Sequence, residues 1–305
     1  MQTNYIDIKM INYDIDSDPK QFVDECEKKY RDQLKAICDD ILSREVPVKV
    51  ILIGGPSCSG KTTSARLLGE VLKDQGKKVI SIEMDNFFIS RNLRPILPNG
   101  SVDYDSINIV DLDLIKKCFT ELFETGKSKF PIYDFIDGVS VHDKKLVKAD
   151  PDTIIIFEGI HTLNPKLIRK LGTSDIYKIF ICNNDGYKYG DIKIEPRQFR
   201  MVRRMVRDVQ FRAVRIANTY KHWKDVTDAE DLYILPYSNK VDAKINTSHA
   251  YEINLYKTDI DEAIHNNEIS YDQIPWFRVF EEIKALNKTF LPKTTLMKEF
   301  VNFEN

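Results

Sequence analysis

The sequence predicts an α/β protein in which a parallel sheet carries helices on both faces. Short apolar runs typical of buried parallel strands recur along the chain, and stretches with helical periodicity separate them. The runs expected to form strands are 48–53 (VKVILI), 78–83 (KVISIE), 153–157 (TIIIF) and 176–182 (IYKIFIC). The segments expected to form helices are 18–44, 62–75, 111–125, 197–217 and 276–286.

The composition is that of a soluble globular chain. The 305 residues include 45 Lys and Arg against 47 Asp and Glu, a formal net charge of −2. A near-neutral chain is not a general polyanion binder, so we expect no nucleic acid partner. No run approaches the length of about 18 apolar residues that spans a bilayer, so we expect no membrane partner. Five cysteines without a C-x-x-C pair favour a reducing, cytoplasmic location.

The two ends of the chain are expected to be helical. Residues 1–47 are expected to form a helical extension of a main domain that covers 48–305. Its helix over 18–44 has Pro19 in the first turn and is interpreted as packing on the main domain, with a partner-binding arm as the alternative. Residues 271–305 are expected to form a helical tail.

The strongest motif is a glycine-rich turn after the first expected strand. Residues 55–62 read GPSCSGKT, which fits the phosphate-binding pattern G-x-x-x-x-G-K-[ST]. The glycines let backbone N–H groups surround a phosphate, and the following helix adds positive potential at its N-terminus. Lys61 is expected to reach the outer phosphates of ATP, and the Thr62 hydroxyl to ligate Mg²⁺. The fold is therefore expected to be of the P-loop NTPase type. The loop residues expected to bind ATP are Gly55, Ser57, Ser59, Gly60, Lys61, Thr62 and Thr63.

A phosphate loop does not say what is done with the nucleotide, and three classes compete. For a GTPase, residues 239–242 (NKVD) match the guanine-reading motif, yet no Asp stands three residues before any of the 12 glycines. For a mechanical ATPase, the run TIIIF should be followed by an acidic pair, and Glu158-Gly159 follows it. We therefore favour a small-molecule kinase and interpret NKVD as a coincidence.

Two carboxylates are expected at the sheet edge where α/β proteins bind ligands. Asp85 follows the expected strand 78–83, where it could accept the proton of an attacking hydroxyl group or hold water on Mg²⁺. Glu158 follows TIIIF and is expected near Mg²⁺ and the γ-phosphate. The alternatives are a surface turn for Asp85 and a buried ion pair with an arginine for Glu158.

Residues 197–221 are expected to form an arginine-rich helical lid. Its arginines at i, i+3, i+4 and i+7 spacing, on one helix face, are Arg200, Arg203, Arg204 and Arg207. Because a guanidinium binds phosphate in a bidentate manner, we expect this face to hold the transferring phosphoryl group. A solvated charged face is the alternative.

The ordered motifs resemble the uridine kinase and phosphoribulokinase family, most closely a bacterial-type uridine kinase branch. They read GGPSCSGKTT, MDNFF, PIYDF, IIIFEGIH, RMVRRMVRD and LPYSNKVDAKINTS. The resemblance implies transfer of the γ-phosphoryl group of ATP, with Mg²⁺, to the 5′-hydroxyl of a nucleoside such as uridine or cytidine. The partner is then a small-molecule nucleoside. We leave the oligomeric state open, since an apolar helix face packs equally well internally or in a homo-oligomer.

The resemblance also implies roles for matched residues. Asp85 matches the general base, Glu158 a carboxylate near the metal, and Tyr133 a residue that lines the nucleoside pocket. The residues expected to be catalytic are Asp85, Lys61, Arg204 and Arg207. Arg203 is expected to join the ATP-binding residues. The residues expected to bind the nucleoside are Asp85, Phe88, Tyr133 and Arg200, and those expected to bind metal are Thr62 and Glu158.

Two departures from the family pattern concern recognition of the base. Residues 137–140 (DGVS) lack the His and Arg that follow Y-D-[FY] in uridine-cytidine kinases, and Phe88 stands where the family has Tyr. Base selectivity is therefore open, whereas the phosphoryl-transfer motifs are intact. The alternatives are a kinase of another small hydroxyl substrate, such as a sugar phosphate, and an ATP-binding regulatory protein without nucleoside kinase activity.

Overall fold

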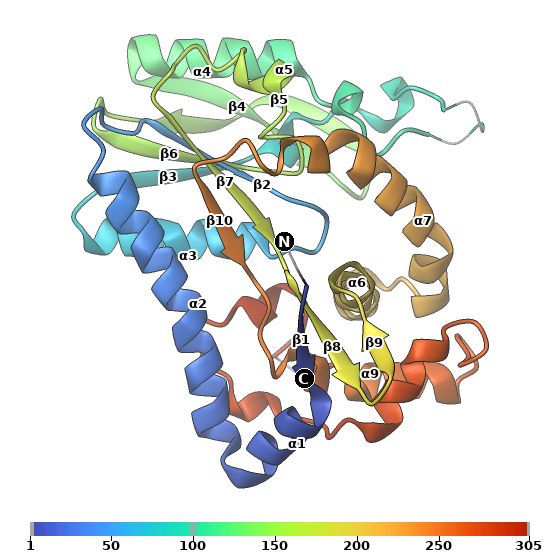
Figure 1. Ribbon diagram of the computed structural model, residues 1–305. Coiled ribbons are helices and arrows are strands. Elements are labelled where there is room, and N and C mark those ends of the chain that lie inside the picture. The colour runs from blue at the N-terminus through green and yellow to red at the C-terminus, as the bar shows by residue number, and fades with distance from the viewer. Residues whose placement is uncertain (1–2, 98–99, 101, 304–305) are drawn as a thin grey trace.

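The centre of the molecule is a five-stranded parallel sheet. The computed structural model describes residues 3–97, 100 and 102–303. The strand order is β10–β7–β2–β6–β3, and every neighbouring pair is parallel (Figure 1). The strands are β2 (Val50–Gly54), β3 (Lys78–Glu83), β6 (Thr153–Glu158), β7 (Ile176–Cys182) and β10 (Ala243–Asn246). All four strands that the sequence predicts are present, and β10 is an addition.

The sheet buries both of its faces, which confirms the predicted fold class. Within β2, Ile51 and Ile53 belong to one apolar core, whereas Val50 and Leu52 belong to the other. This alternation follows from the two-residue period of a strand. The first core contains residues of α2 (Pro19–Leu42), α3 (Lys61–Asp74) and the C-terminal segments, and the second contains residues of α4 (Leu112–Thr125) and β4 (Lys127–Asp134).

The predicted helices 62–75 and 111–125 form close to their expected bounds, whereas the predicted helix 197–217 is divided. The helix after the phosphate loop is α3 (Lys61–Asp74), and the next is α4 (Leu112–Thr125), which Asp111 caps by accepting from the backbone N–H of Leu114 at 2.8 Å. The remaining helices of the main domain are α5 (Pro165–Ile168), α6 (Pro196–Arg212), α7 (Ile216–Tyr233), α8 (Glu252–Leu255) and α9 (Lys257–His265). The predicted helix 197–217 is interrupted, because α6 ends where Ala213 adopts a left-handed φ of 52°.

The N-terminal region contains a strand as well as helices. β1 (Asn4–Asp7) precedes α1 (Ile8–Ser17) and α2 (Pro19–Leu42), so a strand that the sequence did not predict stands before the expected helices. β1 pairs in parallel with β8 (Asp185–Tyr189), which pairs antiparallel with β9 (Ile192–Ile194). The buried side of α2 belongs to the same core as one face of the large sheet, as expected for a packing helix. The domain division at residue 47 stays a prediction.

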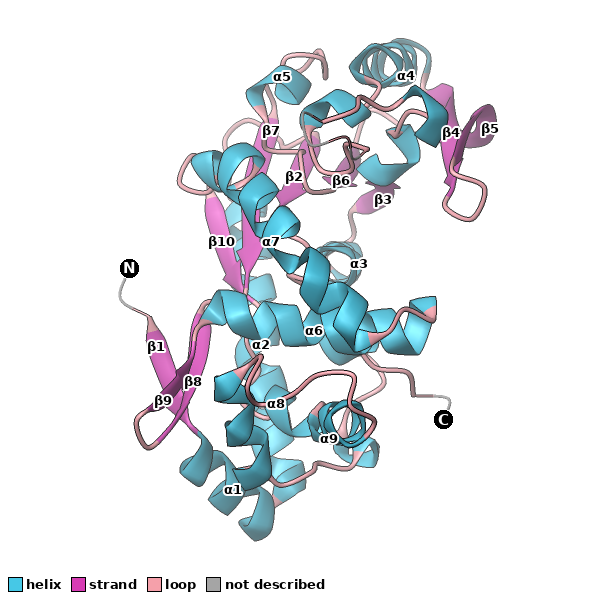
Figure 2. Cartoon of the chain, turned by 90° about the vertical axis from the view of Figure 1, so that its right-hand side faces the viewer, coloured by secondary structure: helices cyan, strands magenta, loops and turns pink. Residues whose placement is uncertain are grey.

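Two further parts of the chain differ from expectation. β4 (Lys127–Asp134) and β5 (Val139–Lys148) form an antiparallel hairpin that the sequence analysis did not predict. This hairpin and the β1–β8–β9 ribbon lie at opposite ends of the molecule (Figure 2). The predicted α-helix around 276–286 is instead a run of 3₁₀ turns, Pro275–Glu282.

Among the residues with described positions, no helix is both long enough and apolar enough to cross a membrane.

Candidate active site

The phosphate loop leads from the end of β2 into the first turn of α3. Gly60 has a φ of 88°, a left-handed conformation that favours glycine. A Cβ atom on Gly55 would lie 2.1 Å from the carbonyl oxygen of Ile181, so only glycine fits there. Lys61 is buried, and its Nζ donates to the carbonyl oxygen of Pro56 at 2.8 Å. The glycines of the loop therefore have the conformation and close contacts that the motif requires, and the Lys61 side chain lies against the loop backbone.

The two residues predicted to bind metal are in direct contact. The hydroxyl of Thr62, at the start of α3, donates to Oε1 of Glu158 at 2.8 Å. Glu158 ends β6 with 7% of its surface exposed, and burial raises its pKa to about 8, with the charge of Asp85 acting in the same direction. Both side chains offer oxygen atoms, which Mg²⁺ prefers, and a buried carboxylate gains from a cation. These residues therefore fit Mg²⁺ bound through one carboxylate and a hydroxyl group.

Asp85 lies on the 3₁₀ turn Met84–Phe87, directly after β3. Burial raises the pKa of Asp85 to about 6, and Lys61 is the strongest opposing charge. Glu83 raises this pKa further, whereas Arg212 and Arg94 lower it. β3 and β6 are neighbours, with Glu83 paired to Glu158, so both carboxylates lie at the same edge of the sheet. The structure thus brings Lys61, Thr62, Asp85 and Glu158 together, as the sequence predicts.

The four predicted lid arginines divide into two pairs with different surroundings. Arg200 and Arg203 are 1% and 0% exposed, and each binds a buried glutamate. Arg203 holds both carboxylate oxygens of Glu252 and donates to the carbonyl oxygen of Thr247 at 2.7 Å. Arg200 donates to Glu230 at 2.7 Å. Both guanidinium groups are thus buried and bonded to glutamates, and their expected roles, ATP binding for Arg203 and nucleoside binding for Arg200, stay predictions.

Arg200 and Arg203 also donate hydrogen bonds to backbone carbonyl groups of the phosphate loop. Arg203 donates to the carbonyl oxygen of Cys58 at 3.4 Å, and Arg200 donates to that of Ser57 at 3.2 Å. Thr247 adds a third contact, because its hydroxyl donates to the carbonyl oxygen of Ser59 at 2.8 Å. These bonds fix the carbonyl groups of three consecutive loop residues. We infer that Arg200 and Arg203 are positioning residues of the loop.

The second pair, Arg204 and Arg207, is partly exposed beside the loop. Arg204 donates to the hydroxyl of Ser57 at 3.2 Å, and its Nε lies 3.6 Å from the carboxylate of Asp208. Arg207 donates to the same carboxylate at 2.7 Å. Asp208 is buried and also accepts from the hydroxyl of Thr219 on α7 at 3.0 Å. These two arginines keep the accessibility that a phosphate-binding side chain needs.

Phe88 and Tyr133 form the other side of the site together with an arginine that the sequence analysis missed. Their rings meet edge to face with centroids 5.8 Å apart, and the Tyr133 hydroxyl accepts from Arg94 at 2.8 Å. The guanidinium of Arg94 lies 5.2–5.4 Å from the ring centroids of Phe88, Tyr104 and Tyr133, a cation–π arrangement. We call these four residues the Arg94 cluster. Arg94 is 8% exposed, and among the described residues no carboxylate lies within 4.0 Å of it.

Three glutamates at the site gave no signal in the sequence. Glu230 binds Arg200, and Glu252 binds Arg203. Glu299 accepts from the backbone N–H of Thr63 at 3.1 Å. Each of them lies in an ordinary stretch far along the chain from its partner or the loop, so no spacing rule identifies them. The NKVD segment has no part in the site, because Asp242 pairs with the backbone of Lys178 at 2.8 and 2.9 Å. Its interpretation as a coincidence agrees with this position.

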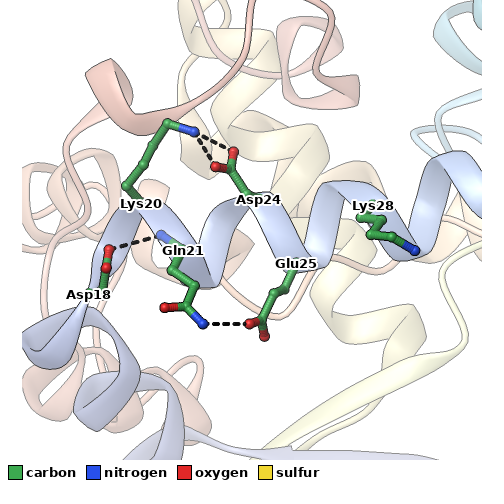
Figure 3. Close-up of a pocket in the computed structure, with 6 residues that line it drawn as sticks. All are labelled: Asp18, Lys20, Gln21, Asp24, Glu25 and Lys28. Atoms are coloured by element: carbon green, nitrogen blue, oxygen red, sulfur yellow. Dashed lines mark hydrogen bonds and ion pairs between the residues drawn. The ribbon is translucent and has the colours of Figure 1, made fainter.

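A surface hollow along the first turns of α2 is unrelated to this site (Figure 3). Its polar side chains bond to one another along the helix. Gln21 donates to Glu25 at 2.9 Å, and Asp18 caps the helix by accepting from the backbone N–H of Gln21. Such pairs at i, i+4 spacing are ordinary features of a solvated helix.

Comparisons with known proteins bear on the family and the fold of the chain. Residues 50–254 match the model of the Phosphoribulokinase / Uridine kinase family. The chain is similar to the uridine kinase of Mycoplasma genitalium, with 30% identity over 177 residues, which cover 58% of this chain and 74% of that protein. It is 28% identical to the uridine kinase of Ligilactobacillus salivarius over 182 residues, 60% of this chain and 76% of the relative. The solved structure of a possible uridine kinase from Bacillus stearothermophilus matches 72% of this chain and all of that chain, with a TM-score of 0.51 and 20% identity.

Proposed function

Because the chain belongs to the phosphoribulokinase and uridine kinase family of phosphotransferases that act on a hydroxyl group, we propose that it is an ATP-dependent nucleoside kinase. Uridine or cytidine is the proposed acceptor, and the product is the 5′-monophosphate. One observation carries this proposal: the phosphate-loop residues Lys61 and Thr62 lie beside two carboxylates of raised pKa, the partly buried Asp85 and the buried Glu158.

Asp85 suits the role of general base. With a pKa of about 6, it is largely ionised at neutral pH and still basic enough to accept a proton from a hydroxyl group. Lys61 lies within electrostatic range of both Asp85 and Glu158, so its ammonium group also stabilises negative charge on the transferring phosphoryl group. Arg204 and Arg207 lie beside the loop with part of their surface exposed, so they can offset negative charge that develops on the transferring phosphoryl group.

Thr62 and Glu158 are the residues that would hold Mg²⁺, which would neutralise charge on the phosphates when bound. The loop's N–H groups orient the nucleotide, because Arg200, Arg203 and Thr247 fix the carbonyl groups of the loop backbone. Ordering these groups before the substrates arrive lowers the reorganisation that phosphoryl transfer requires.

A second candidate is a kinase of a small hydroxyl substrate that carries an anion, such as a sugar phosphate. The Arg94 cluster favours it, because its buried guanidinium has no carboxylate within 4.0 Å among the residues that the structure describes, and such a group is well suited to bind an anion. In the nucleoside kinase, Arg94 would instead donate to a carbonyl oxygen of the base.

The test is ADP release by the full chain with ATP, Mg²⁺ and a panel of uridine, cytidine, adenosine and ribulose 5-phosphate. Turnover with uridine or cytidine that disappears in Asp85→Asn supports the nucleoside kinase. Turnover with ribulose 5-phosphate alone supports the second candidate. Binding of ATP without turnover on any acceptor contradicts both and favours a regulatory protein.

A further inference from the structure

The first turn of α3 lacks an acceptor of its own. Gly60 is its N-cap and has no side chain, and the first turn contains no acidic residue. The N–H groups at the start of a helix need acceptors, and in a phosphate loop the nucleotide's phosphates supply them. The N–H of Thr63 is one of these groups, since the helical bonds begin with Ser64, which donates to Gly60 at 3.0 Å.

In this structure a carboxylate from the opposite end of the chain accepts from that N–H group. Oε2 of Glu299 lies 3.1 Å from the backbone nitrogen of Thr63. The two residues are 236 positions apart, so only the folded tail brings them together. The charge of Glu299 also acts on the residues proposed to bind Mg²⁺, because it contributes to the raised pKa of Glu158.

The backbone that carries Glu299 is firmly held. Leu296 is fully buried, and its Cδ1 lies 2.8 Å from the position a Cβ atom on Gly60 would take. The buried ring of Phe300 lies 4.8 Å below the guanidinium of Arg203. Glu299 itself is partly exposed. Its side chain can therefore turn toward solvent while the tail stays in place.

We propose that Glu299 determines nucleotide affinity by competing with a nucleotide phosphate for the N–H of Thr63. This inference rests on the proposed function, because it takes the loop to bind ATP. One N–H group cannot serve a carboxylate and a phosphate together, so Glu299 turns away when the nucleotide binds. The displaced carboxylate stays close to the phosphates, and like charges at short range weaken binding. Glu299 thus caps α3 in the free protein and lowers its affinity for the nucleotide.

The experiment is calorimetric titration of the full chain with ADP and, separately, with adenosine. Glu299→Gln removes the charge and keeps an oxygen that can accept from Thr63. We expect this variant to bind ADP about fivefold to tenfold more tightly than the wild type, in the range of a charge placed at a helix N-terminus. Adenosine, which has no phosphate, should bind both proteins equally. Glu281→Gln makes the same charge change on an exposed part of the tail and should leave ADP affinity unchanged.

Several outcomes would overturn the inference. Equal or weaker ADP binding by Glu299→Gln would make Glu299 a structural cap, and an equal gain in Glu281→Gln would indicate a general effect of net charge. A gain for adenosine as large as that for ADP would point to a change outside the phosphates. Glu299→Ala repeats the test if the first variant melts below the assay temperature. Failure of the wild type to bind ADP would instead contradict the proposed function, so the two failures are distinguishable.

Discussion

The two sides of the site are assembled in different ways. The phosphate side comes from one continuous stretch, 54–63, between a buried strand and a helix. The opposite side combines Asp85 and the Arg94 cluster, which come from the segment after β3, the loop that follows it, and the β4–β5 hairpin. A continuous stretch is held by its own turn geometry, whereas the other side depends on how separate segments pack. The phosphate loop is therefore built locally, whereas the opposite side of the site is built by tertiary contacts.

The largest expected effect tests whether the two sides work as one site. Lys61→Ala and Asp85→Asn should each lower turnover at least about a hundredfold, because each removes a charged group from the transition state. Melting temperatures measured in parallel should show that both variants stay folded. Near-normal turnover in either variant would remove that residue from its proposed role.

Neighbouring arginines on α6 give the next largest contrast. Arg203→Met should lower the free energy of unfolding by about 3–5 kcal/mol, because Glu252 is then buried without a partner. Arg204→Met should change it by less than about 1 kcal/mol and instead reduce turnover. Urea unfolding and ADP-release assays separate the two effects.

The control for this pair is Arg203→Met combined with Glu252→Leu, which removes both charges and should recover part of the lost stability. Normal stability with weakened ATP binding in Arg203→Met would return Arg203 to the ATP-binding role that the sequence suggests.

Arg94→Gln tests the opposite side of the site. We expect the acceptor KM to rise about tenfold, the size expected when a charged hydrogen bond is lost, while the KM for ATP stays unchanged. Tyr133→Phe, which removes only the hydroxyl partner of Arg94, should have a smaller effect. Equal rises in the two KM values would mean that the two sides are not separable.

The smallest expected effect is on pH dependence. Asp85 must be ionised to accept a proton, and its pKa is about 6, so kcat/KM should fall about tenfold per pH unit below that value. Glu83 contributes to the raised pKa, so Glu83→Gln should move the midpoint to lower pH. A midpoint that stays in place, or moves upward, would exclude Asp85 as the titrating group.

The sequence by itself determined the α/β class, four strands of the sheet, the phosphate loop and the carboxylates Asp85 and Glu158. These follow from short-range rules: a two-residue period for strands, a glycine pattern for the loop, and the ends of neighbouring parallel strands for the carboxylates. The arginine spacing on α6 was also visible, but spacing identifies a face without showing what lies against it.

Only the tertiary structure decided how those arginines divide. Glu230 and Glu252 come from elements far along the chain and bind Arg200 and Arg203, which leaves Arg204 and Arg207 accessible. The β1–β8 pairing, the Arg94 cluster and the contact of Glu299 with Thr63 also join distant segments. Such contacts depend on burial and charge pairing across the folded molecule, and local sequence patterns contain no record of which distant segment supplies the partner.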